Sequence, residues 1–338
     1  MGQPAIGGMA GLAGRRARLH MKRRAGLTFA ASCALLPRLV LAQQARVARI
    51  GVLVPRQQQF RVGEVLEHLQ QLGWRQRDTL EVEERIGDTP QILDEYAAEL
   101  VRLRVEVIVA LITPSVLAAR RASQSIPIVM AGAAIDPVSS GLAKSLAAPG
   151  GNVTGITVPG AHLASKSLEL VRELRGPTGR IGVLANGADP FTPALLKTLT
   201  DAAQVLDIRL SMTTVRSRDE YAAAFSAWRA SRIDAVFVQP SLATDHAAAL
   251  ALSHRLASFS FVRVFASSGG LLSYAARSSE IARRSADYID RILRGEDPAR
   301  LPVEQAKSYD LVLNLRTARA LGISVPNLLM LRATEVIE

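Results

Sequence analysis

Residues 49–54 read RIGVLV, and residues 180–184 repeat the pattern as RIGVL. Each stretch is short and almost wholly apolar, which is typical of a parallel strand covered on both faces. Apolar residues at helical spacing follow the first stretch at Val62, Val65 and Leu69. The first stretch therefore predicts the start of a strand–helix–strand unit, and its repetition predicts a second one.

Further strand-like runs continue this alternation through both halves of the chain. They lie at residues 80–84, 105–112, 126–131, 208–214, 235–239 and 262–266. Amphipathic helical patterns separate them, and the Pro- and Gly-rich residues 148–158 mark the join between the halves. This alternation predicts an α/β protein with two doubly wound parallel-sheet lobes.

Length and composition agree with two domains. The chain has 338 residues, where a domain usually takes about 150. Hydrophobic residues make up 49% and aromatic residues only 4%, which favours α/β layers over an all-β sandwich. Cys33 is the only cysteine, so the sequence excludes a disulfide framework and a thiolate metal site. We expect no cofactor and no metal.

The net charge of +11 does not indicate a nucleic-acid partner. Residues 1–42 carry seven basic side chains and no acidic one, which leaves +4 for the rest of the chain. There the basic residues alternate with acidic ones, as on a solvated surface, rather than forming a phosphate-binding stripe.

The N-terminal segment has the pattern of a secretory signal. Lys22, Arg23 and Arg24 precede a short apolar stretch at residues 25–36, and Ala42 follows as a cleavage position. The apolar stretch is shorter than the about 20 residues of a membrane span. We expect cleavage after Ala42 and a periplasmic location. The general and twin-arginine export routes both stay open.

Known catalytic patterns are absent from the sequence. It holds no G-x-S-x-G, P-loop, G-x-G-x-x-G or H-E-x-x-H motif, and its five histidines are scattered. We therefore expect the protein not to be an enzyme.

Polar residues followed by proline recur shortly after strand ends. They are Thr113-Pro114, Asp136-Pro137, Asp189-Pro190 and Gln239-Pro240. In open α/β sheets these ends face a crevice, where helix N-termini offer unpaired N–H groups. Their convergence favours a site for a carboxylate or another polar group. Taken alone, each one is explained more simply as the start of a helix.

Several long stretches resemble one known family. They are AGAAIDPVSSGLAKSL (131–146), PGGNVTGIT (149–157), GGLLSYA (269–275), RILRGEDPARLPVEQ (291–305), YDLVLNLRTARALGISVP (309–326) and RATEVIE (332–338). These stretches resemble the ABC transporter substrate-binding proteins, which have the type I periplasmic binding protein fold. Some members are linked to tryptophan or tyrosine uptake. The resemblance covers nearly all of residues 46–338.

The resemblance implies two discontinuous lobes joined by a three-stranded hinge. Lobe one would combine residues 46–152 with 270–307, and lobe two residues 155–266 with 308–338. Residues 1–42 would be an N-terminal extension and signal peptide.

The chain departs from the family at two places. Residues 55–61 (PRQQQFR) are shorter than the family's usual loop, and Ala275 stands where the family often has glycine. Since that loop borders the cleft in the family, we expect one wall of the cleft to be altered.

Positions carried over from the family's strand ends provide seven candidate ligand contacts. They are Thr113, Ser115, Asp136, Asn186, Gln239, Ser267 and Tyr274. Asp136 is expected to pair with an ammonium group of the ligand or only to cap its helix. Tyr274 is expected to stack on an aromatic or apolar ligand or to pack at the hinge.

The implied function is that of an extracytoplasmic solute-binding protein of an ABC importer. It would capture a small organic solute, such as an aromatic amino acid, by hinge closure. Its partners would be that ligand and the transporter's permease subunits, without nucleic acid, and we expect a monomer. The alternative is a ligand-sensing subunit for a membrane receptor.

Overall fold

A computed structural model of the protein describes residues 47–176, 179–189 and 191–338, which include both RIGVL stretches. The first stretch lies in a six-stranded parallel sheet with the order β11-β5-β4-β3-β1-β2. Its strands are β1 (Ala48–Pro55), β2 (Leu80–Gly87), β3 (Val107–Leu111), β4 (Ile128–Ala133), β5 (Val153–Thr157) and β11 (Val303–Gln305).

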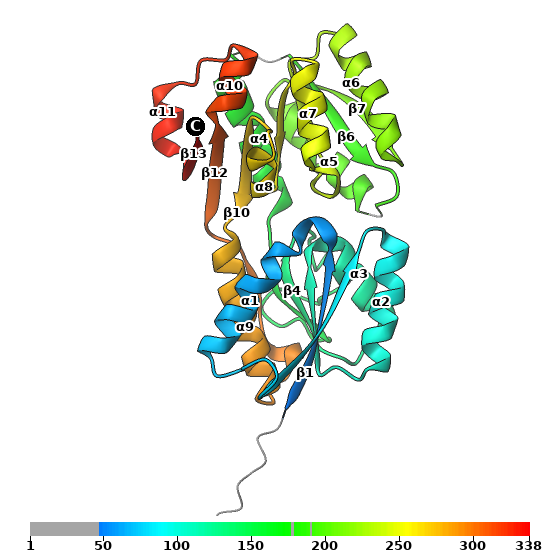
Figure 1. The fold of residues 1–338 in the computed structure, drawn as a ribbon. Helices are drawn as coiled ribbons and strands as arrows, with labels where there is room; N and C mark the ends of the chain where they lie inside the picture. The colour runs from blue at the N-terminus through cyan, green and yellow to red at the C-terminus, as the bar shows by residue number, and fades with distance from the viewer. Residues whose placement is uncertain (1–46, 177–178, 190) are drawn as a thin grey trace, which may run out of the picture. The chain divides into compact units, whose positions relative to one another are not determined.

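Helices cover both faces of this sheet. They are α1 (Phe60–Gln71), α2 (Pro90–Arg102), α3 (Ile112–Ala122) and α9 (Ser278–Leu293). Successive side chains of β1 point to opposite faces: Ile50 and Val52 belong to the core that includes α1 and α9, and Leu53 to the core under α2 and α3. The sheet and these helices form the first lobe (Figure 1).

The second RIGVL stretch lies in a seven-stranded sheet with the order β13-β12-β10-β9-β8-β6-β7. All neighbouring pairs are parallel except β10 and β12. Its strands are β6 (Arg180–Asn186), β7 (Arg209–Val215), β8 (Ala235–Val238), β9 (Ala257–Ser260), β10 (Leu272–Ala276), β12 (Tyr309–Asn314) and β13 (Glu335–Ile337).

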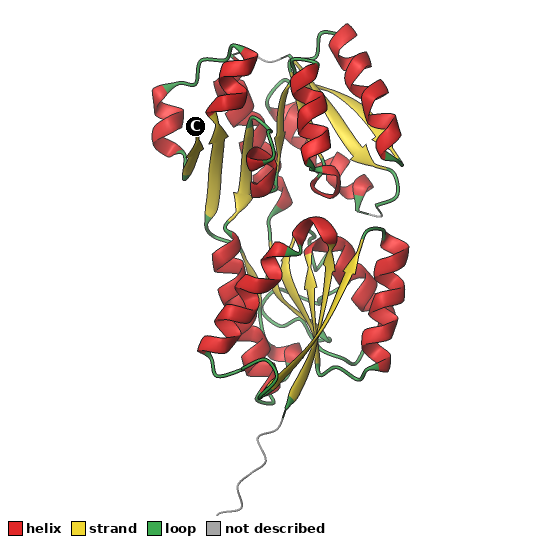
Figure 2. Cartoon of the chain, viewed as in Figure 1, coloured by secondary structure: helices red, strands yellow, loops and turns green. Residues whose placement is uncertain are grey.

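Helices also flank the second sheet, and together they form the second lobe (Figure 2). They are α4 (Gly160–Arg175), α5 (Thr192–Val205), α6 (Tyr221–Ala230), α7 (Asp245–Ser253), α8 (Arg263–Ser267), α10 (Leu315–Leu321) and α11 (Asn327–Arg332). Two lobes with mostly parallel sheets confirm the predicted α/β class.

The chain passes between the two sheets three times. The passes follow β5, β10 and β11. Sheet membership differs from the predicted lobe boundaries at two strands, because β5 pairs with β4 in the first sheet and β10 pairs with β9 and β12 in the second. Strand partners are tertiary information, so the sequence could not place these two crossings to the residue.

The predicted strand at residues 262–266 is wrong. The strand here is β9, which lies before it, and residues 263–267 form the short helix α8. The sequence of β9, ASFS, is half serine, yet every residue is buried between β8 and β10. The Ser260 hydroxyl donates a 2.8 Å hydrogen bond to the Val238 carbonyl, so this buried polar group has a partner.

The glycine in each RIGVL stretch lets a helix approach the sheet closely. A Cβ at Gly51 would lie 2.8 Å from Leu100 of α2, and one at Gly182 would lie 2.9 Å from the indole ring of Trp228 in α6. Trp228 is buried in a close-packed core, so it has little room to move away.

We expect Gly182→Ala to lower the free energy of unfolding by about 1–3 kcal/mol through overpacking against Trp228. Chemical denaturation followed by circular dichroism measures this change. Gly151→Ala is the matched control, since a Cβ there meets nothing within 4 Å. Equal stability of the two variants would contradict the close-packing explanation.

No helix in the described part of the chain is long and apolar enough to cross a bilayer. Within the same residues, no group of three or more His, Cys, Asp or Glu side chains is placed to hold a metal ion. The predicted signal and its cleavage position at Ala42 lie outside the described residues.

Candidate ligand-binding site

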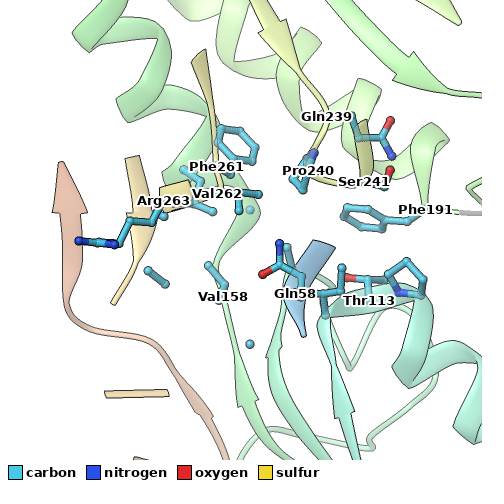
Figure 3. A pocket seen from close by; sticks show the side chains of 18 of the residues that line it. Gln58, Thr113, Val158, Phe191, Gln239, Pro240, Ser241, Phe261, Val262 and Arg263 are labelled. Carbon is cyan, nitrogen blue, oxygen red and sulfur yellow. The ribbon is translucent and has the colours of Figure 1, made fainter. Parts of the chain in front are cut away.

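The carboxyl ends of strands from both sheets border one cavity of about 280 Å³. From the first lobe it is lined by Gln58, Arg61, Glu64, Ile112, Thr113, Pro114, Gly132, Ala134, Ser278 and Ile281, among others. From the second lobe the lining includes Leu163, Asp189, Phe191, Leu195, Gln239, Pro240, Ser241, Phe261 and Val262. Figure 3 shows Gln58 and Thr113 facing Phe191, Gln239 and Pro240 across the cavity.

Most of this lining is apolar, with polar groups at a few positions. Phe191 and Phe261 supply aromatic surface from the second lobe, and Ile112 and Ile281 supply aliphatic surface from the first. Small-molecule sites have this composition, in which apolar walls enclose the ligand and a few polar groups orient it. The volume suits a small organic solute.

The backbone is strained at Ile112, where β3 ends and α3 begins. Its φ of 53° lies in the left-handed region, which a β-branched side chain rarely adopts. Such a conformation costs about 1–3 kcal/mol and tends to occur at functional sites. The unusual turn places Ile112 and Thr113 together in the wall of the cavity.

A network of hydrogen bonds holds the second-lobe wall. The Gln239 side-chain amide donates to Asp189 Oδ2 over 2.9 Å, and its Oε1 accepts from the Asn186 backbone N–H over 2.8 Å. Asp189 also accepts from the Phe191 N–H (3.0 Å) and the Ser241 hydroxyl (3.3 Å). Gln239 therefore ties the end of β8 to the end of β6.

Burial raises the pKa of the Asp189 carboxyl above its ordinary value, while hydrogen bonds from Phe191, Ser241 and Gln239 act in the opposite direction. Three donors thus stabilise the charged form in a place that disfavours it. These hydrogen bonds hold the Asp189 carboxyl in a fixed position in the second-lobe wall.

Arg61 contributes a charge of a different kind. Burial lowers the pKa of its guanidinium, and the negative charge of Glu64 partly opposes that shift. No hydrogen bond or ion pair joins Arg61 to any residue in the described part of the chain. The first-lobe wall therefore presents a half-buried cation without a protein partner.

Among the seven candidate contacts, Thr113 and Gln239 line the cavity, from opposite lobes. Asn186 borders a smaller adjoining pocket together with Asp189 and Ser241. Of the four polar–proline positions, those beginning at Thr113, Asp189 and Gln239 converge on the cavity.

The other candidates lie elsewhere. Ser115 is fully buried within α3, and its hydroxyl has no hydrogen-bond partner. Asp136 is exposed and accepts hydrogen bonds from the Val138 and Ser139 N–H groups, which is the arrangement of a turn cap. Ser267 is exposed in α8.

Tyr274 lies in the middle of β10, opposite Leu311 of β12. Its ring stacks on Tyr309 with centroids 5.4 Å apart, and its hydroxyl lies 3.1 Å from His162 Nε2. It does not belong to the residues that line the cavity.

Sequence reasoning missed Arg61, Glu64, Phe191 and Phe261. Arg61 and Glu64 stand one helical turn apart, so the helical pattern could have placed them on one face. It could not show that this face meets the second lobe. Gln58 and Arg61 belong to residues 55–61, the segment that we expect to be shorter than in the family, and both line the cavity.

Two α/β lobes, three connecting passes and a cavity lined from both lobes define a solute-binding protein of the periplasmic binding protein type. The chain belongs to the ABC transporter substrate binding protein family, whose sequence pattern it matches over residues 54–337. Membership of a substrate-binding family supports the expectation that the protein is not an enzyme.

Individual relatives agree with this assignment. A tyrosine-binding protein of Clostridioides difficile (strain R20291) is 25% identical over 283 residues, which are 80% of this chain and 79% of that protein. A conserved domain protein of Vibrio cholerae has a similar structure, with a TM-score of 0.79, 26% identity, and 86% of this chain and all of that chain covered. An ABC domain from Streptococcus pneumonia, solved with L-Trp, has a TM-score of 0.77 at 22% identity over 86% of this chain and all of that one.

We expect Gln239→Ala to lower the free energy of unfolding by about 1–3 kcal/mol, because it removes a donor from buried Asp189. The raised pKa of Asp189 means that its contribution is most favourable at low pH and is lost as the carboxyl ionises. Because the lost donor stabilises the ionised carboxyl, the loss of stability in the variant should be larger at about pH 7 than at about pH 4. Denaturant titrations at both pH values measure it, with Gln70→Ala on the exposed face of α1 as the control.

Proposed function

We propose that the protein captures an amino acid or a similar small organic solute and delivers it to an ABC importer. The observation that carries this proposal is the cavity of about 280 Å³, which is lined from both lobes. The relative named for tyrosine and the neighbour solved with L-Trp support an amino acid as the ligand. Thr113, Gln239 and Phe191 would contact it.

Hinge closure would couple capture to delivery. A ligand that contacts both lobes binds the closed form better than the open form, so it shifts the population toward closure. The permease subunits would then recognise the closed form. The lobes would be divided at the three passes that follow β5, β10 and β11. An extracytoplasmic location, after cleavage at Ala42, is part of this proposal.

The first test is a thermal-shift screen of the purified protein against amino acids, sugars and organic acids, followed by calorimetry. A ligand at about 100 times its Kd should add about 2.7 kcal/mol to the free energy of unfolding. Phe191→Ala should weaken binding about 10-fold through lost aromatic contact. Leu328→Ala, whose leucine is 72% exposed on α11, should bind like the wild type. A screen without any stabilising solute would refute the proposal.

The second test is small-angle X-ray scattering with and without the ligand found in that screen. Closure predicts a smaller radius of gyration at saturating ligand, because the lobes approach each other. An unchanged radius despite saturation would show that capture does not involve closure.

A further inference from the structure

The charged residues in the cavity wall differ in their partners. Arg263 forms an ion pair with Glu335, and Asp189 accepts hydrogen bonds from three donors. Glu64 accepts one hydrogen bond from the Ser278 hydroxyl, at 3.2 Å from Oε1. Among these cavity residues, only the guanidinium of Arg61 has neither an ion pair nor a hydrogen bond within the described chain.

The fold makes room for this guanidinium at the end of β4. Gly132 has a φ of 83°, and a Cβ there would lie 3.1 Å from Nη2 of Arg61. The guanidinium therefore lies against a bare stretch of backbone at the carboxyl edge of the first sheet. A side chain at Gly132 would push it out of this position.

Burial without a partner is costly for a cation, so the position favours the arrival of an anion. Glu64 lies one helical turn from Arg61, and its charge helps to keep the guanidinium protonated. No ion pair joins the two side chains within the described chain. The planar fork of Arg61 thus remains available to a ligand, and such forks bind carboxylates through two parallel hydrogen bonds.

We propose that Arg61 is the residue that recognises the carboxylate of the captured solute, so that the cavity selects an apolar body bearing a carboxylate. This inference rests on the proposed capture function and specifies its ligand class. The apolar walls around Phe191 and Phe261 would hold the body of the solute. The carboxylate is the required group, and an ammonium group is not.

Matched probes separate the two groups. One set is L-tyrosine, L-tyrosinamide and 3-(4-hydroxyphenyl)propionate, and a second is L-leucine, L-leucinamide and 4-methylpentanoate. In thermal-shift and calorimetric measurements on the wild type, we expect the amino acid and the deaminated acid of at least one set to bind. The amides, which lack the carboxylate, should not bind.

Variants assign the effect to the side chain. Arg61→Gln should weaken binding of the acids about 100-fold, and Arg61→Lys, which keeps the charge but loses the fork, should weaken it less. Arg75→Gln is the control, since Arg75 is exposed and outside the cavity. Without ligand, Arg61→Gln should unfold at a temperature no lower than the wild type, because it removes an unpaired, half-buried charge.

The outcomes separate this inference from the proposed function. Binding of the amides as tightly as the acids, or unchanged acid binding by Arg61→Gln, would overturn the role of Arg61 and leave solute capture intact. Absence of binding by all six probes would overturn both the amino-acid proposal and this inference. If Arg61→Gln fails to fold, the comparison of acids with amides on the wild type still decides whether a carboxylate is required.

Discussion

Three passes of the chain between two sheets hold the carboxyl ends of both sheets against one cavity. Parallel strands require that every helix start at the same edge of its sheet, so polar residues from distant parts of the sequence gather there. Thr113 follows β3 in the first lobe, whereas Gln239 follows β8 in the second, and the two line the same space. Because the cavity is lined from both lobes, a change in the angle between the lobes would alter its shape.

The two walls of the cavity differ in how their polar groups are satisfied. In the second lobe, Gln239 bonds to Asp189 and to the backbone at Asn186, so the polar groups of this wall have partners without a ligand. In the first lobe, Arg61 has no such partner in the described chain. A satisfied network fixes shape, while an unpaired charge provides binding energy to whatever completes it. The unpaired guanidinium and the complete hydrogen-bond network therefore lie on different lobes of the cavity.

The wall that we expect to depart from the family also carries Arg61, whose guanidinium has no ion pair or hydrogen bond within the described chain. The segment at residues 55–61 brings Gln58 and Arg61 to the cavity, which the strained turn at Ile112 also lines. The comparisons establish the fold and the family, but they do not identify the solute that this wall contacts. Differences in ligand among members of one fold commonly arise in such loops, because the sheets beneath them do not need to change.

The sequence by itself determined the class of the fold. Buried parallel strands need apolar runs, and amphipathic helices need apolar residues at a spacing of 3.6. Both patterns are local, so RIGVLV at residues 49–54, its repetition at residues 180–184 and the alternation that follows them predicted the α/β class. Local patterns failed at β9, where serines lie in a buried strand, and at the crossings after β5 and β10. Strand partners and helix faces across a cavity depend on contacts between residues far apart in the chain. For that reason only the tertiary structure brought Thr113 and Gln239 together, left Asp136 as an exposed turn cap, and revealed Arg61.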